Sequence, residues 1–390
     1  MAPFSRTDTE PASRLSEMIA RGKSAARQAG LAAAYARSWI RAPNGPIRVV
    51  MSVTRRCNLR CSMCRSWQAQ VEGELSPAEI GSILSEMPEL LSLDLTGGEP
   101  FVRPDMDEVL DTVLRTAPRL RMLHFTTNGW LGERAATLVK AVRRQRPDLE
   151  IVPTVSVDGP PEVHDEVRGR EGSFERAISA FEQLSEIPGV RPYVGTTVTP
   201  LNASRVEELG EILGRRLNAF DPSFWHWNWL QISSHFFGNE DLRLPEDEIP
   251  ERLLPRHIAR RGLPSSLMDL MEACFILNLE FVRRGEPADL PCQAMRSTAF
   301  ISAEGVLYPC HVWDRPVGDA RRGFASLWRS EEAMRARRGV ERLACGGCFT
   351  PCEAYPMFAG APLTTLRVST SRALRLAGEM LTASRKGRKG

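Results

Sequence analysis

The feature that most constrains this 390-residue chain is a run of three closely spaced cysteines, Cys57, Cys61 and Cys64. Their spacing is C-x3-C-x2-C, and they directly follow an apolar stretch, residues 47–53, that is typical of a strand. Three thiolates on one tight loop can bind three irons of a cubane cluster and leave the fourth iron without a protein ligand. An open metal position is where a small molecule can bind and react. The spacing therefore indicates a reactive iron–sulfur cluster rather than a structural one.

The main alternative for this loop is a zinc knuckle. Zinc sites usually have four protein ligands, supplied by two CxxC pairs or by added histidines. The first histidine of the chain is His124, well beyond the three cysteines. Ligand preference therefore favours the iron–sulfur cluster.

The composition is ordinary for a soluble globular protein, with 42% hydrophobic and 25% charged residues. The net charge of +3 is too small to indicate nucleic-acid binding. No apolar run is long enough to span a bilayer, and residues 1–10 are polar, without the apolar core of a secretory signal. Nine cysteines in such a chain indicate a reducing compartment, so we expect a cytoplasmic protein.

Strand-like and helical stretches alternate along the middle of the chain. The strand-like stretches are residues 47–53, 90–95, 121–126, 151–157, 190–198 and 224–232. The helical stretches between them are residues 76–87, 105–116, 132–145, 173–186 and 203–217. This alternation predicts an α/β fold with a parallel sheet, and six units suit an open partial (β/α)6 barrel. Such folds place their chemistry at the carboxyl ends of the strands.

Five segments make up the predicted domain organisation. We expect an N-terminal helical extension over residues 1–45, the partial barrel over 46–237, a linker with a helix over 238–290, a small Cys-rich domain over 291–356, and a basic amphipathic helix and tail over 357–390.

Polar turns follow the predicted second, third and fourth strands. Gly97-Gly98-Glu99 follows the second strand, Thr127-Asn128 ends the third, and Ser156 ends the fourth, with Arg168 shortly after it. Glycines let a backbone approach a ligand closely, a carboxylate pairs with an ammonium, and a guanidinium suits a carboxylate. Ordinary glycine and Asn-Gly turns and a surface ion pair of Arg168 are the alternatives.

Together, the three-cysteine loop and these turns resemble the radical S-adenosylmethionine (radical SAM) enzyme superfamily over about residues 47–352. The resemblance implies that the open iron of a 4Fe-4S cluster chelates the amino and carboxylate groups of SAM. It also implies that one electron, from a reductant such as flavodoxin or ferredoxin, cleaves SAM to methionine and a 5′-deoxyadenosyl radical. That radical then abstracts a hydrogen atom from a substrate.

The resemblance also assigns roles to the turns. It implies that Gly97, Gly98 and Glu99 contact the SAM amino group, that Thr127, Asn128 and Ser156 face the ribose, and that Arg168 faces the SAM carboxylate. One position departs from the family, because the residue before the third cysteine is often aromatic and here is Met63. A thioether can fill the same space and contact a ring, so we interpret Met63 as a variant.

A second group of cysteines lies in the small domain. Cys292 and Cys310 flank a predicted hairpin with its turn at residues 303–305, and Cys345 and Cys348 form a CxxC pair. Four thiolates complete a cubane, and a zinc ribbon is the alternative. The arrangement resembles the twitch domain, a half-sized relative of the SPASM domain. Because the middle SPASM cysteines are missing, we expect one auxiliary 4Fe-4S cluster.

Two further residues are weak catalytic candidates. Cys352 is surplus to the four ligands, and it could replace one of them, donate a proton or hydrogen atom, or have no role. His226 lies in the strand 224–232, where three tryptophans are expected on one face and His226 and Asn228 on the other. His226 could accept a proton from the substrate, but a structural histidine is the alternative.

The substrate is less constrained than the cofactors. An auxiliary cluster can take an electron from a substrate radical, which favours an oxidation (a dehydrogenation) or a bond-forming step. The N-terminal extension is short for a peptide-recognition domain, so we expect a small-molecule or lipid substrate. A maturase of a ribosomal peptide and a non-catalytic iron–sulfur or zinc protein are the rivals. The basic terminal helices could contact a membrane surface, but capping the barrel is the ordinary role of such helices.

Overall fold

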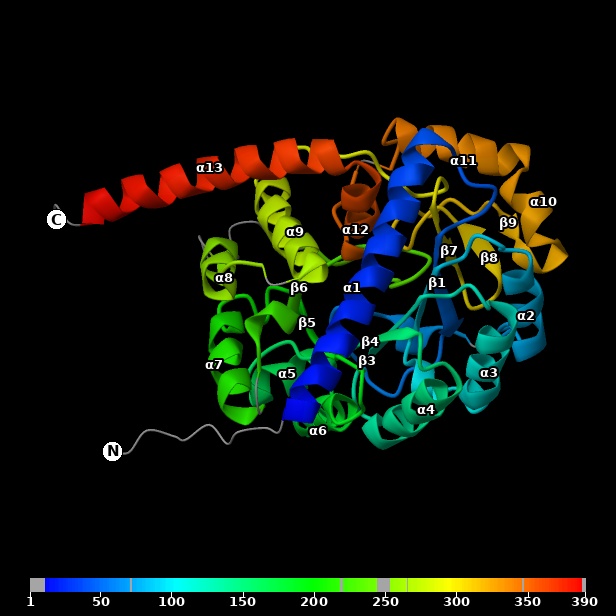
Figure 1. Cartoon of the computed structure of the whole chain (residues 1–390), viewed down its shortest axis with the longest axis horizontal. Helices are drawn as coiled ribbons and strands as arrows, with labels where there is room; N and C mark the ends of the chain where they lie inside the picture. The colour runs from blue at the N-terminus through cyan, green and yellow to red at the C-terminus, as the bar shows by residue number, and fades with distance from the viewer. Residues whose placement is uncertain are drawn as a thin grey trace.

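The computed structural model describes residues 11–70, 72–217, 220–243, 253–264, 266–345 and 347–387. Its centre is a sheet of nine strands in the order β6-β5-β4-β3-β2-β1-β7-β8-β9 (Figure 1). The first six strands are parallel and lie side by side in sequence order: β1 (Arg48–Thr54), β2 (Ser92–Gly97), β3 (Met122–Thr127), β4 (Glu150–Ser156), β5 (Tyr193–Val198) and β6 (Trp225–Trp229). β6 is an edge strand of this sheet, so the α/β fold with an open six-stranded unit is confirmed.

Helices alternate with these strands, as the sequence predicts. They are α2 (Pro77–Ser85), α3 (Met106–Thr116), α4 (Gly132–Gln145), α5 (Pro161–Arg168), α6 (Ser173–Ser185) and α7 (Val206–Arg216). β1 and β2 are almost wholly buried because helices cover one face and the cavity-side elements cover the other. The short α5 was not predicted. Its eight residues end at Arg168, and the following Gly169 caps the helix in a left-handed conformation with φ 65°.

The C-terminal region is built onto the same sheet. β7 (Thr298–Ile301) pairs in parallel with β1, and β8 (Val306–Tyr308) pairs antiparallel with β7, which confirms the predicted hairpin. β9 (Gly318–Asp319) completes the edge, and α10 (Phe324–Trp328), α11 (Glu331–Glu341) and α12 (Pro351–Gly360) follow. One sheet therefore contains strands from both sides of the predicted boundary at residue 291, and the division into domains stays a prediction.

Four further helices lie outside the alternation of strands and helices. α1 (Pro11–Ile40) crosses the molecule in front of the strands, and α13 (Pro362–Gly387) runs along one edge and extends past the rest of the fold (Figure 1). α8 (Leu253–Arg261) and α9 (Leu267–Arg283) lie beneath α13, and α8 was not predicted within the linker. None of the described helices combines the length and apolarity needed to cross a bilayer.

Candidate active site

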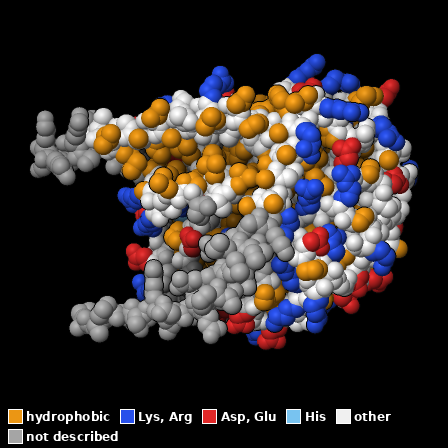
Figure 2. Space-filling view, in the orientation of Figure 1, with side chains coloured by type: hydrophobic (Ala, Val, Ile, Leu, Met, Phe, Trp, Pro, Cys, Tyr) orange, Lys and Arg blue, Asp and Glu red, His pale blue; other side chains and the backbone are white. Residues whose placement is uncertain are grey.

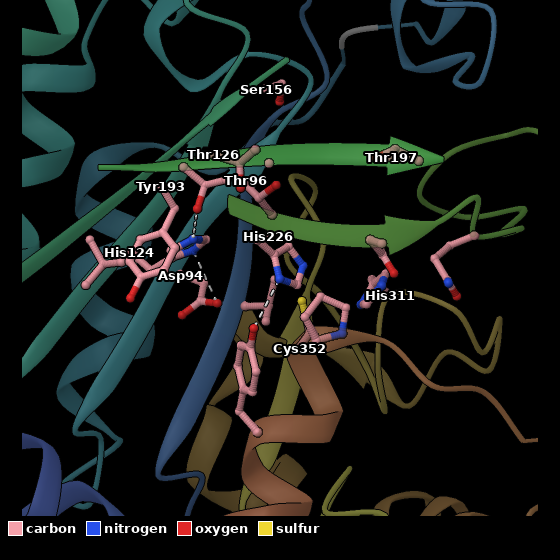
Figure 3. Close-up of a pocket in the computed structure, with 18 of the residues that line it drawn as sticks. Asp94, Thr96, His124, Thr126, Ser156, Tyr193, Thr197, His226, His311 and Cys352 are labelled. Carbon is pink, nitrogen blue, oxygen red and sulfur yellow. Dashed lines mark hydrogen bonds and ion pairs between the residues drawn. The ribbon is translucent and has the colours of Figure 1, made fainter. Parts of the chain in front are cut away.

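A cavity of about 380 Å³ lies against one face of the six parallel strands. Each strand contributes alternate residues to it, because successive side chains of a strand point to opposite faces. Figure 3 shows such residues from β2 to β6 around the space. Residues of α1, α9 and α12 also line the cavity, so it is enclosed by elements that lie far apart in the sequence. Its lining includes these predicted site residues: Cys57, Cys61, Cys64, Gly97, Gly98, Thr127, Asn128, Ser156, Arg168, His226 and Cys352.

The three-cysteine loop is held against the turn after β2. The amide of Gly98 donates to the carbonyl of Thr54 at 2.9 Å, and the amide of Glu99 donates to the carbonyl of Arg56 at 2.9 Å. A Cβ atom at Gly98 would lie 2.2 Å from the Arg56 oxygen, so only glycine fits this approach. The two glycines therefore have a structural role in placing the cysteine loop, and their contact with the SAM amino group stays a prediction.

Glu99 is not among the residues that line the cavity. Its buried carboxylate accepts hydrogen bonds from the amides of Asn128 (2.7 Å) and Phe101 (3.2 Å) and from the Thr127 hydroxyl (3.0 Å). Burial raises the pKa of Glu99 to about 7, although these hydrogen bonds lower it. In this arrangement the carboxylate fixes the turn after β3, and its predicted contact with the SAM amine stays a prediction.

Arg168 lies in a buried ion pair beside the cluster loop. Its Nε atom is 2.6 Å from Oδ2 of Asp158, and one terminal nitrogen is 3.8 Å from Sγ of Cys61. The Arg168 side chain is about one-tenth exposed and that of Asp158 is fully buried. The surface ion pair considered for Arg168 is therefore wrong, and its guanidinium reaches the cavity next to a cluster thiol.

The four auxiliary cysteines lie together outside this cavity. Cys292 and Cys310 pack in one apolar cluster with Val340. Burial raises the pKa of the Cys310 thiol to about 12, with smaller contributions from Glu353 and from the nearby Cys345. Burial also raises the pKa of the Cys348 thiol, and Cys310 makes the next largest contribution. Four neighbouring thiols are the donor set that a cubane requires.

Cys352 lines the cavity, unlike these four cysteines, and whether it is a cluster ligand stays open. It sits in the first turn of α12, and it lines the same cavity as His226 (Figure 3). Burial raises the pKa of its thiol to about 12, and its charged neighbours are Arg48, Asp94 and Glu353. Arg48 also donates to its backbone carbonyl at 2.8 Å.

His226 is part of a polar cluster that sequence reasoning found only in part. Its Nδ1 atom lies 2.9 Å from both carboxylate oxygens of Glu272 on α9, and 3.2 Å from the hydroxyl of Tyr355 on α12. Tyr355 also donates to Glu272. Burial alone would raise the pKa of Glu272, but the facing His226 lowers it overall, so this carboxylate is ionised at neutral pH. The tryptophans Trp225, Trp227 and Trp229 are buried on the opposite face, as predicted.

The protonation of His226 follows from this geometry. An imidazole nitrogen that faces a carboxylate carries the proton, so the proton of neutral His226 lies on Nδ1. Nε2 then has a free lone pair, and among the described residues it has no hydrogen-bond partner. His226 can therefore accept a proton at Nε2 while Glu272 stabilises the resulting cation.

A second buried polar cluster forms another part of the wall. Arg48 is paired with Asp94, and His124 lies between Asp94 (3.5 Å) and the Thr154 hydroxyl (2.9 Å). Burial alone would raise the pKa of Asp94, but Arg48 and His124 hold it well below its usual value. Sequence reasoning missed this cluster and Glu272. The available signal was an acidic residue inside an apolar strand or helix, which must find a partner when buried.

Two family models match the chain. The radical SAM superfamily model matches residues 51–212, and the SPASM iron–sulfur cluster-binding domain model matches residues 292–349. The parallel sheet with three thiols at its cavity thus places the protein among the SAM-dependent iron–sulfur enzymes. More specifically, the chain belongs to the radical SAM superfamily and carries a C-terminal SPASM iron–sulfur domain. It uses SAM, a 4Fe-4S cluster and auxiliary iron–sulfur chemistry.

Characterised relatives have different functions. The AdoMet-dependent heme synthase of Oleidesulfovibrio alaskensis is 29% identical over 77% of this chain and 79% of its own length. The mycofactocin maturase of Mycobacterium tuberculosis is 26% identical over 82% of this chain and 81% of its own length.

Solved structures share the fold. Streptococcus suis SuiB bound to its precursor peptide SuiA has a TM-score of 0.55 at 15% identity, and the match covers 87% of this chain and 74% of that chain. The structure of anSMEcpe with bound AdoMet has a TM-score of 0.52 at 16% identity and covers 83% of this chain and 100% of that chain.

Proposed function

We propose that this radical SAM enzyme carries out a two-electron oxidation of a small-molecule or lipid substrate and holds one auxiliary 4Fe-4S cluster. The observation that carries the proposal is His226, which lines the same cavity as the three thiols of the cluster loop, faces Glu272 through Nδ1, and has no partner for its buried Nε2 atom within the described part of the chain. A dehydrogenation needs a proton acceptor in that position. A flavodoxin or ferredoxin is the reductant we expect.

The cofactor ligands follow from the two cysteine groups. Cys57, Cys61 and Cys64 would hold the SAM cluster, and Cys292, Cys310, Cys345 and Cys348 would hold the auxiliary cluster. When bound, SAM and its cluster supply the 5′-deoxyadenosyl radical, and the auxiliary cluster supplies an electron acceptor. Arg168 and the turns at Gly98, Asn128 and Ser156 would position SAM beside the cluster loop.

His226 would accept the proton that the substrate loses in the oxidation. Loss of one hydrogen atom leaves a substrate radical, and a two-electron oxidation then requires the loss of one electron and one proton. His226 receives the proton at Nε2, and the ionised Glu272 stabilises the imidazolium. Tyr355 donates to the same carboxylate and so orients it. Glu272 and Tyr355 are positioning residues.

The walls of the cavity support a largely apolar substrate. Leu31 of α1, Met268 and Met271 of α9, and Phe236 and Phe237 line it. Buried apolar walls stabilise apolar groups and leave the few polar clusters to fix orientation. A peptide substrate is the second candidate, because the mycofactocin maturase is similar over most of its length and SuiB shares the fold.

Deuterium transfer tests the function without a known substrate. Cells grown in D2O are extracted into lipid, small-molecule and peptide fractions, and each is incubated anaerobically with reconstituted enzyme, SAM and dithionite. Deuterium in 5′-deoxyadenosine identifies the fraction that loses a hydrogen atom. We expect transfer from the lipid or small-molecule fraction, and none with the Cys57→Ala/Cys61→Ala/Cys64→Ala variant. Transfer from the peptide fraction alone would favour a maturase.

A further inference from the structure

We propose that α13, together with the adjoining part of α9, docks the enzyme on an anionic lipid surface. The inference goes beyond the oxidation proposed above and does not rest on it. It starts from four leucines of α13, namely Leu363, Leu366, Leu374 and Leu381, which are 83%, 66%, 70% and 66% exposed. A helix turns about 100° per residue, so these four side chains lie within an arc of about 80°. They form one continuous apolar row, here called the leucine row.

The leucine row is not the face that holds α13 to the fold. That role belongs to the buried Ser369, which accepts a hydrogen bond from Asn278 of α9 at 3.0 Å, and to Leu376, which packs with Leu277 and Phe281. Exposed apolar residues scattered singly are common, but a row on one helix face marks an interaction surface. The leucine row is therefore available to a partner without any loss of internal packing.

The apolar surface continues from α13 toward the cavity. Figure 2 shows hydrophobic side chains gathered over α13 and α9 on one face of the molecule. On α9, Leu267 and Leu270 are 37% and 47% exposed, and Leu267 also lines the cavity. A lipid surface against this face would therefore meet the rim of the substrate cavity.

Charge favours an anionic lipid surface over a second copy of this chain or a protein partner. The exposed Arg367 borders the leucine row, and Arg375 lies farther round the same side of α13. Residues 362–390 contain seven arginine and lysine residues, these two included, and one acidic residue, Glu379. The last seven residues carry four basic residues and no acidic one. An apolar helix face flanked by basic residues is the pattern of interfacial helices that bind anionic lipids.

The test uses the reconstituted full chain and two kinds of vesicle. Binding is measured by cosedimentation with 3:1 phosphatidylcholine:phosphatidylglycerol vesicles and with pure phosphatidylcholine vesicles. The leucine row is changed by Leu366→Gln/Leu374→Gln/Leu381→Gln. The matched control is Leu201→Gln/Met334→Gln, which changes exposed apolar residues elsewhere (47% and 40% exposed).

We expect the wild type and the control to bind the anionic vesicles, with weaker binding at high salt, and the leucine-row variant to bind at least about tenfold more weakly. SAM cleavage without substrate should be equal in all three proteins, which separates this test from the proposed oxidation. Absence of wild-type binding, or equal binding by the leucine-row variant, would overturn the proposal. A wild-type dimer that the leucine-row changes dissociate would assign the surface to a second copy instead.

Discussion

The two groups of cysteines differ in their relation to the cavity. Cys57, Cys61 and Cys64 line it, whereas Cys292, Cys310, Cys345 and Cys348 lie outside its lining. Both groups are connected to β1, because the first follows its carboxyl end and two members of the second, Cys292 and Cys310, flank a hairpin whose first strand pairs with it. The difference indicates that the first group is placed to react with molecules bound in the cavity and that the second is not.

The largest expected effect is the loss of all SAM cleavage from the first group. Cys57→Ala/Cys61→Ala/Cys64→Ala should reduce 5′-deoxyadenosine to background, because no thiolate remains to hold the cluster that binds SAM. Cys345→Ala/Cys348→Ala should retain SAM binding and SAM cleavage, since these residues lie away from the cavity. Iron analysis should give about eight irons for the wild type and about four for either variant, at four irons per cubane. Loss of SAM binding in the Cys345→Ala/Cys348→Ala variant would contradict the assignment of different roles to the two cysteine groups.

The next effect concerns the proposed proton acceptor, His226. His226→Asn should lower product formation by about 10²–10⁴-fold, the usual contribution of a general base. Deuterium transfer from substrate to 5′-deoxyadenosine should persist, because it precedes proton loss. Equal losses of deuterium transfer and product would show that His226 only shapes the cavity.

Glu272→Gln provides a readout that a purely structural role would not change. Without the carboxylate, the imidazolium that forms on His226 loses its stabilising partner, so the step that removes the substrate proton should slow. Product formation should therefore fall in this variant, while deuterium transfer to 5′-deoxyadenosine persists. Tyr355→Phe keeps the carboxylate and is the matched control, in which product formation should fall less.

The sequence was most informative where function depends on consecutive residues. The six parallel strands and the cysteine loop were predicted because periodicity and spacing are local properties. Glu272 and Tyr355 could not be predicted, since they reach His226 from helices 46 and 129 positions away. Likewise, Glu99 was expected to face SAM, but its oxygens are engaged by backbone amides that only the folded turn brings near. Long-range polar pairing is set by packing, which a single sequence does not display.

A smaller effect is expected from the ion pair of Arg48 and Asp94 in the cavity wall. Asp94→Asn leaves Arg48 buried without its charge partner, and such a loss costs about 3–5 kcal/mol of stability. Glu175→Gln breaks the pair with Arg216, whose side chains are 58% and 44% exposed, and should cost less than about 1 kcal/mol. Anaerobic urea titration of the reconstituted proteins measures both. Similar midpoints for the two variants would mean that water or a rearranged neighbour compensates Arg48.

The smallest expected effect distinguishes the roles open to Cys352. This residue lies on the cavity side, and its charged neighbours are Arg48, Asp94 and Glu353 rather than the four auxiliary thiols. Cys352→Ser should therefore leave the iron content near that of the wild type, at about eight per chain, and SAM cleavage without substrate should change little. Cys348→Ser is the matched control, because it removes an expected ligand four positions earlier and should lower the iron content. If Cys352→Ser loses as much iron as Cys348→Ser, then Cys352 is a ligand and the division between the two cysteine groups does not hold.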